Sequence, residues 1–198
     1  MHISEGVLSG TALALGWAGT LTCTAIGLKK TDTNKIVRTA LLSSAFFLAS
    51  LVNIRLGPSS THLSLLAPVG LILGWSSFPA MLIALFLQAV LFHFGGLLVL
   101  GANTFIMGIP ALMVHVIFGK MIRSENKIFF GFMAFIAGFL AVIMGACLAG
   151  VFLGISDRNF LEAAKLLFYA HIPLALIEGA VTSFMIMFLR KTSPEFLS

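Results

Sequence analysis

The chain has 198 residues, of which 59% are hydrophobic and only 10% are charged, and its mean hydropathy is +1.08. A water-soluble domain carries about a quarter charged residues, so this chain has too little polar material to cover a surface in water. The composition excludes a soluble enzyme, a nucleic-acid-binding domain and a disordered chain, and it fits a single membrane domain over residues 1–198. The net charge of +5 then reflects the Lys/Arg bias of cytoplasmic loops rather than a nucleic-acid partner.

Seven apolar segments are predicted as helices, because a backbone in lipid must satisfy its own hydrogen bonds. In chain order they cover residues 3–27, 36–56, 62–75, 78–100, 103–121, 128–155 and 160–189. Most have the roughly 20 residues that a transmembrane helix needs. Segment 62–75 is shorter and contains Pro68, so we expect a half-depth or re-entrant helix there. No basic region precedes the first segment, so no cleavable signal peptide is expected.

The basic residues predict the orientation of these segments. Nine of the twelve lie in the loop Lys29–Arg38, the loop Lys120–Lys127 and the tail at Arg190–Lys191. Basic loops face the cytoplasm, and the two loops share a side only if an even number of crossings separates them. Four segments lie between these loops, and segment 62–75 is one of them. The number of crossings is even only if this short segment crosses the membrane. This predicts an all-α, polytopic transmembrane bundle of about seven spans, with the N-terminus outside and the C-terminus inside.

The N-terminus carries the most informative pattern, an amine followed by a histidine at position two. The Met1 amine, the deprotonated main-chain nitrogen of His2 and the His2 imidazole Nδ1 can close two adjacent chelate rings around one metal ion. Three coplanar nitrogens leave one in-plane position open. A square of nitrogens favours Ni(II) or Cu(II) and accepts low-spin Co(II), whereas zinc prefers a tetrahedron and magnesium or calcium prefer oxygen. The alternative is a chance histidine at a frayed terminus.

His62 is predicted as the fourth ligand, because the expected topology places it on the same face as His2. It follows Leu56–Thr61, a stretch rich in turn formers, and the alternative is a bystander in a helix-capping region. His93 is a candidate for a residue that supports the metal-binding side chains or for one on the path by which metal enters. The alternative is a buried histidine that is hydrogen-bonded to a backbone carbonyl. Asn103 is predicted either to cap its helix or to orient the metal site by a hydrogen bond.

His171 and Glu178 are seven residues apart and therefore share a face of the last helix. We interpret them as a polar clamp between helices, with a proton or ion relay as the alternative. Cys23 and Cys147 lie inside apolar runs without a CxxC partner, so they are expected to be packing residues rather than a disulfide or metal ligands.

Three functions compete at this point. The first is capture of Co(II) or Ni(II) by a membrane transport subunit. The second is an intramembrane zinc metalloenzyme using His93, His171 and Glu178, although the sequence has no HExxH motif or comparable spacing. The third is a channel or structural protein in which the histidines are incidental. No GxxxxGK[ST] motif is present, so an ATP-driven step would need an ATPase in another chain. We therefore expect no catalytic residue in this chain.

Four stretches resemble one protein family. The opening Met1–Gly6, MHISEG, resembles the MHIxEG opening of the CbiM/NikM family, the cobalt/nickel substrate-binding (S) components of energy-coupling-factor (ECF) ABC transporters. Thr61–Leu63 resembles its (S/T/G)HL segment, Gly95–Phe105 its GG…LGAN signature, and His171–Gly179 its IPxAxxEG segment. The resemblance covers essentially the whole chain in order. One departure is Phe94, because similar proteins often carry Asp or His directly before the Gly-Gly pair.

The resemblance implies a square-planar site formed by the Met1 amine, the His2 amide and imidazole, and His62. The transported Co(II) or Ni(II) is the only metal implied, with no other cofactor. The implied partners are a transmembrane scaffold subunit, ATPase subunits and a small accessory membrane subunit, in the plasma (inner) membrane of a bacterium or archaeon. The face of Ala14 and Ala18, small residues at helix-packing spacing, is a candidate for scaffold contact. Neither the residues nor the resemblance separates cobalt from nickel.

Overall fold

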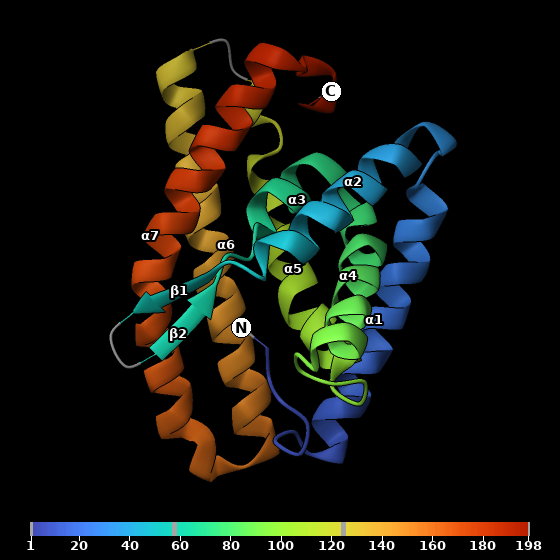
Figure 1. Ribbon diagram of the computed structural model, residues 1–198, viewed down its shortest axis with the longest axis vertical. Helices are drawn as coiled ribbons and strands as arrows, with labels where there is room; N and C mark the ends of the chain where they lie inside the picture. Colours follow the sequence, from blue (N-terminus) through green and yellow to red (C-terminus); the bar gives the residue numbers. More distant parts are fainter. Residues whose placement is uncertain (1, 57–58, 124–125, 198) are drawn as a thin grey trace.

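The structure, a computed structural model, describes residues 2–56, 59–123 and 126–197. Within these residues the chain forms a bundle of α-helices joined by short connections (Figure 1). The α-helices are α1 Gly10–Lys30, α2 Thr33–Ala49, α3 Leu66–Leu73, α4 Ser77–Phe92, α5 Leu100–Phe118, α6 Lys127–Ser156 and α7 Leu161–Thr192. The 3-10 turns are η1 Gly74–Ser76, η2 Met121–Arg123, η3 Arg158–Phe160 and η4 Pro194–Leu197. Each of the seven predicted apolar segments holds one α-helix.

The first helix begins at Gly10, seven residues later than predicted. The Ser9 side chain accepts a hydrogen bond from the main-chain nitrogen of Ala12, a capping interaction that sets the start of α1. Residues before it remain outside any helix, although Ile3 and Leu8 are buried against α5 and α6. Their hydrophobicity therefore marks a packed N-terminal segment rather than the first turns of a helix.

A short antiparallel hairpin interrupts the all-α fold expected from the sequence. Strand β1 (Asn53–Leu56) pairs with β2 (Ser59–His62), and Asn53 lies opposite His62. The predicted helix over residues 36–56 was therefore wrong at its C-terminal end, because α2 stops at Ala49. The turn-forming residues that follow cannot extend α2 and close the hairpin instead. The hairpin lies beside α7, partway along the height of the bundle (Figure 1), and His62 is the last residue of β2.

Five helical stretches of the described residues are long and apolar enough to cross a membrane. They are α1, the combined stretch of α3, η1 and α4 (Leu66–Phe92), α5, α6, and η3 with α7 (Arg158–Thr192). The third predicted segment, 62–75, holds the short helix α3 of 8 residues, and α3 belongs to one stretch with η1 and α4, so its prediction as a separate half-depth or re-entrant crossing stays untested. α2 has 17 residues and is not among these stretches. The count of seven spans and their orientation therefore stay predictions.

Basic residues gather at one end of the bundle. The Lys30 ammonium lies 4.7 Å from the centroid of the Trp75 ring, and the Arg38 guanidinium lies 5.2 Å from that of Phe196. These contacts join the end of α1 and the start of α2 to η1 and the C-terminal turn. The opposite end holds the N-terminal segment, where the Ser9 nitrogen donates to Ser156 Oγ at the end of α6. This arrangement agrees with the predicted sharing of one side by the Lys29–Arg38 loop and the tail.

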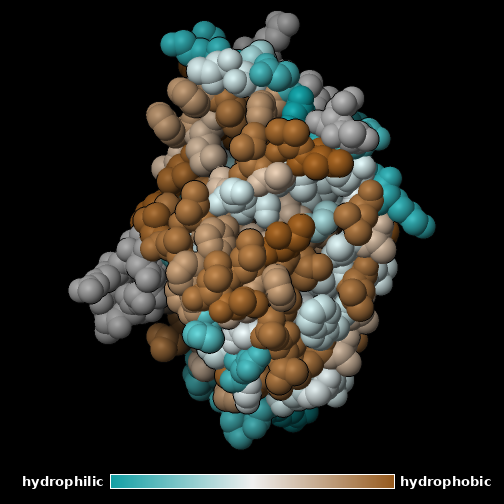
Figure 2. Space-filling view, turned by 45° about the vertical axis from the view of Figure 1, so that its right-hand side comes forward, coloured by the Kyte–Doolittle hydropathy of each residue, from teal (hydrophilic) through white to brown (hydrophobic). Residues whose placement is uncertain are grey.

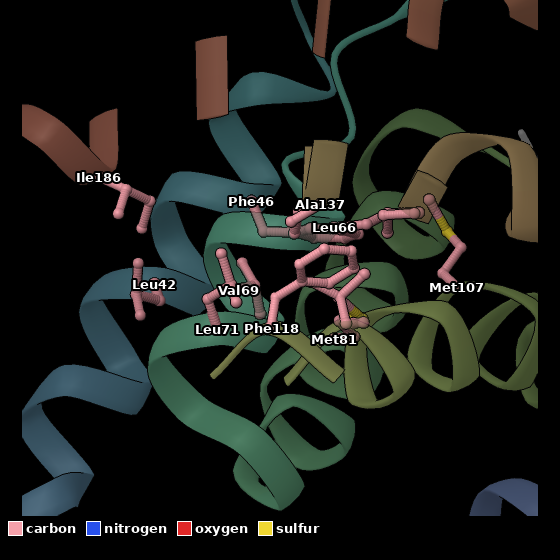
Figure 3. Close-up of a cluster of buried hydrophobic side chains, with 14 of the residues drawn as sticks. Leu42, Phe46, Leu66, Val69, Leu71, Met81, Met107, Phe118, Ala137 and Ile186 are labelled. Atoms are coloured by element: carbon pink, nitrogen blue, oxygen red, sulfur yellow. The ribbon is translucent and has the colours of Figure 1, made fainter. Parts of the chain in front are cut away.

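The core surrounds α3, the most enclosed helix (Figure 3). The labelled residues around it come from five other helices: Leu42 and Phe46 of α2, Met81 of α4, Met107 and Phe118 of α5, Ala137 of α6 and Ile186 of α7. A Cβ at Gly70 of α3 would collide with the backbone of Ala111, so α3 and α5 approach each other as closely as two backbones can. This packing fixes the position of the chain that leads from His62 into the core.

The outer surface of the helices is largely apolar. Large hydrophobic side chains such as Ile128 (85% exposed) and Phe184 (72% exposed) point outward. Figure 2 shows hydrophobic residues over most of one side of the molecule, with hydrophilic residues gathered towards its ends. A surface of this kind suits hydrocarbon rather than water. The protein is therefore a multi-pass membrane protein.

Candidate metal centre

The structure brings His2 and His62 together although 60 positions separate them in the sequence. Their ring centroids are 4.8 Å apart, and the ring planes are inclined by 26°. Burial lowers the pKa of His2 well below its ordinary value and lowers the pKa of His62 to about 4. Both imidazoles are therefore neutral near pH 7, which is the form that binds metal ions.

The ring nitrogens of the two histidines lie in different surroundings. The Nδ1 of His62 lies 3.0 Å from the carbonyl oxygen of Leu63. When Nδ1–H donates to this carbonyl, Nε2 carries the lone pair, the arrangement typical of metal-binding histidines. The Nε2 of His2 is buried and has no hydrogen-bond partner among the described residues. A buried polar atom without a partner is uncommon, but Nε2 is not the nitrogen that the predicted chelate uses, which is Nδ1.

Asn103 holds the N-terminal segment by two hydrogen bonds. The main-chain nitrogen of Ile3 donates to Asn103 Oδ1, and Asn103 Nδ2 donates to the carbonyl oxygen of Ile3, both at 3.0 Å. Asn103 is 2% exposed and lies in the first turn of α5, whose N-cap position is Val99. Of the two roles predicted for Asn103, the structure therefore shows a hydrogen bond that orients residue 3, next to His2, and not the helix cap.

The loop after α4 closes over the same segment. The Glu5 nitrogen donates to the Gly95 carbonyl oxygen at 3.1 Å, and the Leu98 nitrogen donates to Glu5 Oε1 at 2.9 Å. Gly95 and Gly96 have φ angles of 77° and 125°, in the left-handed region that glycine tolerates best. A Cβ at Gly96 would collide with the Glu5 side chain, so this loop has no room for a larger residue. Sequence reasoning missed the part that Glu5 plays, because no local spacing links it to the Gly-Gly pair.

His93 does not take part in this arrangement. It is the exposed C-cap of α4, with a left-handed φ of 56°. The neighbouring Phe94 lies against His2 instead, with ring centroids 6.2 Å apart. The exposure of His93 shows that the alternative of a buried histidine is wrong, whereas a role beside the metal or on its entry path stays a prediction. The Phe94 ring covers this side of His2. His115 lies at the other end of the bundle, where its Nδ1 is 3.4 Å from the Leu71 carbonyl oxygen.

α7 contributes two buried polar residues near the hairpin. His171 is 7% exposed, and its Nδ1 lies 2.7 Å from the carbonyl oxygen of Leu167 within the same helix. Glu178 accepts hydrogen bonds from Ser64 and Leu65, which connect β2 to α3. The predicted polar clamp is thus formed by Glu178, between α7 and this connection.

The proposed enzyme site receives no support from this geometry. His93 is exposed at the end of α4, whereas Glu178 is engaged with the connection after β2. Within residues 2–56, 59–123 and 126–197, no group of three or more His, Cys, Asp or Glu side chains could hold a metal ion. Met1, which is predicted to supply the amine ligand, lies outside the described residues. The predicted nitrogen set is therefore described only for its two histidines.

Curated relatives of this chain are assigned to metal transport. A protein assigned to metal transport in Haemophilus influenzae is 34% identical over 202 residues, covering 100% of this chain and 97% of the relative. The cobalt transport protein CbiM of Kyrpidia tusciae is 30% identical, covering 100% of this chain and 86% of the relative. The fused nickel transport protein NikMN of Rhodobacter capsulatus is 28% identical, and this chain covers 64% of it.

Solved structures agree with the fold. A crystal structure of a truncated transition metal transporter has a TM-score of 0.79 to this chain at 23% identity, covering 97% of this chain and 99% of the other. The family model of the cobalt uptake substrate-specific transmembrane region, CbiM, matches residues 2–196. This match runs from the histidine of the N-terminal segment to the C-terminal turn, and it includes every element that forms the candidate centre. The chain therefore belongs to the CbiM family of cobalt uptake substrate-specific transmembrane proteins.

Proposed function

We propose that this protein captures Co(II) or Ni(II) from outside the cell in a square-planar nitrogen site and delivers the ion for ATP-driven import. The site consists of the Met1 amine, the main-chain nitrogen and Nδ1 of His2, and Nε2 of His62. The contact between His2 and His62 carries the proposal. The hairpin and the N-terminal segment are remote in the chain, and nothing in the packing of the helices alone requires their two imidazoles to meet.

The spacing of the two rings supports coordination of one shared ion. A metal–imidazole bond of about 2.0 Å puts a ring centroid roughly 3.2 Å from the metal, so two imidazoles on adjacent corners of a square have centroids about 4.5 Å apart. The observed separation is 4.8 Å, with ring planes only 26° from parallel. The two rings are stacked face to face, so the His62 ring would need to turn to place a nitrogen in the plane of the His2 chelate.

The hydrogen bonds that hold Ile3 and Glu5 support a role for the N-terminal amine and His2 as a metal chelate. A frayed N-terminus would lose considerable conformational entropy on closing around a metal ion. Here Asn103 and the Gly95–Gly96 loop already hold the main chain of Ile3 and Glu5. These contacts fix the chain next to His2, and a fixed binding segment favours tight binding.

Delivery is proposed to need the partners of an ECF transporter: a transmembrane scaffold subunit, ATPase subunits and a small accessory membrane subunit. The surface of α1 offers a face for the scaffold. Its buried residues, such as Gly16 and Thr20, pack on α5, whereas Ala14 and Ala18 are exposed on another side of the helix. Small exposed residues four positions apart allow a partner helix to approach closely.

Metal analysis of the purified protein tests this function. Protein with a native N-terminus is loaded separately with Co(II), Ni(II) and Zn(II), and bound metal is measured together with its absorption spectrum. We expect one Co(II) or Ni(II) per chain, a spectrum of a planar nitrogen site, and much weaker retention of Zn(II). A tetrahedral zinc site, or no retained metal, would contradict the proposal. The preferred ion decides between cobalt and nickel.

A further inference from the structure

The connection between His62 and α3 is buried and irregular. Ser64 is 2% exposed, Leu65 is 7% exposed, and Leu65 adopts a left-handed conformation with φ 47°. This conformation is costly for a residue with a branched side chain and persists only where surrounding contacts impose it. Buried main-chain N–H groups outside a regular element also require acceptors from elsewhere in the molecule.

Glu178 supplies those acceptors from the middle of α7. Its Oε1 accepts from the Ser64 nitrogen, from Ser64 Oγ at 2.9 Å and from the Leu65 nitrogen at 3.2 Å, while Oε2 also lies 3.2 Å from the Leu65 nitrogen. Glu178 is itself 1% exposed. A carboxylate that accepts from main-chain N–H groups in a buried place forms hydrogen bonds stronger than those between neutral groups.

The position of Glu178 is fixed by the packing of α6 against α7. A Cβ at Gly138 of α6 would lie 2.7 Å from the carbonyl oxygen of Glu178, and a Cβ at Gly179 would lie 2.9 Å from that of Phe135. The two backbones are therefore in close contact at this level, so α7 cannot shift or rotate here without a collision. Glu178 is a rigid point of attachment for the connection.

A continuous series of contacts runs from this attachment to the metal ligand. Ser64 and Leu65 are bound to Glu178. Leu63, the residue before them, is bound to Val52 through its nitrogen at 3.4 Å and to the His62 Nδ1 through its carbonyl oxygen at 3.0 Å. The orientation of the His62 ring therefore depends on the main chain that Glu178 holds.

We infer that Glu178 is a positioning residue that holds the connection after His62, and thereby the His62 ring, in the orientation needed to bind the transported metal. This inference rests on the proposed function. It gives a specific role to a buried acidic group in the last helix, which the proposed nitrogen site does not use as a ligand. It also makes α7 a direct structural link to the ligand on the hairpin.

Four variants test this role: Glu178→Gln, His62→Ala, the double variant, and Thr182→Val. Glu178→Gln keeps the size of the side chain but removes the charge and turns one acceptor oxygen into a donor. Thr182→Val is the matched control, because Thr182 is buried one turn further along α7 and its Oγ1 has no hydrogen-bond partner among the described residues. Metal affinity and the absorption spectrum of bound Ni(II) are measured for each, with the thermal unfolding of the metal-free protein as a check on folding.

Loss of a group that orients a metal ligand typically weakens metal affinity on the order of 10–100-fold. We expect such a loss for Glu178→Gln. The absorption spectrum of bound Ni(II) should also shift towards that of His62→Ala. We expect wild-type affinity for Thr182→Val. In the His62→Ala background, Glu178→Gln should cause no further loss, because its effect is exerted through a ligand that is already absent. A purely structural role would instead produce the same loss in both backgrounds.

Wild-type affinity in Glu178→Gln, or an equal loss in both backgrounds, would overturn the inference while leaving the proposed function intact. Wild-type affinity in His62→Ala would overturn the proposed site itself. If Glu178→Gln does not fold, Ser64→Ala removes one donor to the same carboxylate. We then expect a loss of about threefold, and no loss in that variant would count against the inference.

Discussion

At the scale of single residues, the candidate centre depends on groups whose protonation is set by burial. The imidazoles of His2 and His62 have lowered pKa values because they are withdrawn from water. A ring that stays neutral does not need to release a proton when it binds a metal ion. Near neutral pH, protons then compete with the metal ion only for the proposed amine of Met1 and the main-chain nitrogen of His2.

The two nitrogens that must lose protons determine the expected pH dependence of metal binding. An α-amine has an ordinary pKa of about 7.7–8.0, and the main-chain nitrogen of His2 loses its proton on coordination. The His62 ring, with a pKa of about 4, stays neutral down to about pH 5. Affinity should therefore fall on acidification, with the logarithm of the affinity constant changing by about two per pH unit between pH 5.5 and 7. Titration calorimetry over this range would measure the slope. A slope near four would mean that both rings also release protons, and a flat profile would exclude the amine.

Replacing Asn103 should weaken metal binding more than replacing His93, although histidine is the more usual metal ligand. Asn103→Ala leaves the buried main-chain groups of Ile3 without their partners, which should cost about 2 kcal/mol of stability and weaken metal binding on the order of tenfold. His93→Ala is the matched control, because His93 is exposed at the end of α4, and it should bind metal normally. Equilibrium binding of Ni(II) compares the two. The reverse order of effects would contradict the orientation assigned to the N-terminal segment.

At the scale of elements, the site is assembled by three connections rather than by helix faces. The N-terminal segment, the loop after α4 and the hairpin before α3 each contribute residues close to His2. The helices hold these connections through Asn103 of α5 and Glu178 of α7. A rigid bundle that carries irregular chain at its functional site is common in membrane transport proteins, where non-helical backbone is tolerated only inside the protein.

The Gly95–Gly96 loop offers a test at this scale. Gly96→Ala would place a methyl group against Glu5 at a φ of 125°, so we expect a loss of stability of about 1–3 kcal/mol and weaker metal binding. Gly10→Ala is the control, because a Cβ there meets no atom within 4 Å, and this variant should keep its stability and affinity. Thermal unfolding in detergent measures both. Normal stability in Gly96→Ala would show that the loop does not close over Glu5.

The elements also show which parts of the structure the sequence could predict. Apolar segments located all seven helices, because each is a local pattern. Chelate chemistry and the expected topology predicted that His2 and His62 meet, and their rings do lie together, whereas metal binding by them stays a prediction. The hairpin escaped because its strands have four residues each, too few for an alternating pattern. The links from Glu5 to Leu98 and from Glu178 to Ser64 escaped because they join positions 93 and 114 apart. Such pairs are set by packing alone.

At the scale of the whole molecule, the basic residues and the candidate metal centre lie at different heights along the bundle. Lys30 and Arg38 lie at the end that carries the C-terminal turn, whereas the start of α1 lies at the other end (Figure 1). Under the positive-inside rule, the metal would then enter from outside and face the partners through the opposite side. The strands β1 and β2 lie between these two ends (Figure 1), and His62 at the end of β2 stacks on His2.

Labelling of single cysteines in intact cells tests this orientation. Cys23 and Cys147 are first replaced by alanine, and one cysteine is then introduced at Leu98 or at Lys120. Leu98 is 65% exposed in the loop after α4, so a membrane-impermeant thiol reagent should label Leu98→Cys in intact cells. Lys120→Cys should react only after the membrane is permeabilised. The opposite pattern would reverse the proposed direction of capture.

The terminal chelate is tested by comparing two proteins that differ only in front of Met1. Both are released from a cleavable fusion, one beginning at Met1 and the other with four glycines before it, and Ni(II) and Co(II) affinity is measured for each. The extension turns the Met1 amine into a peptide amide and carries the new terminal amine too far from His2 to close five- and six-membered rings with its imidazole, while every described contact of His2, His62 and Asn103 is left unchanged. We expect tight binding by the native protein and a large loss of affinity in the extended one. Equal affinity in the two proteins would exclude the Met1 amine as a ligand.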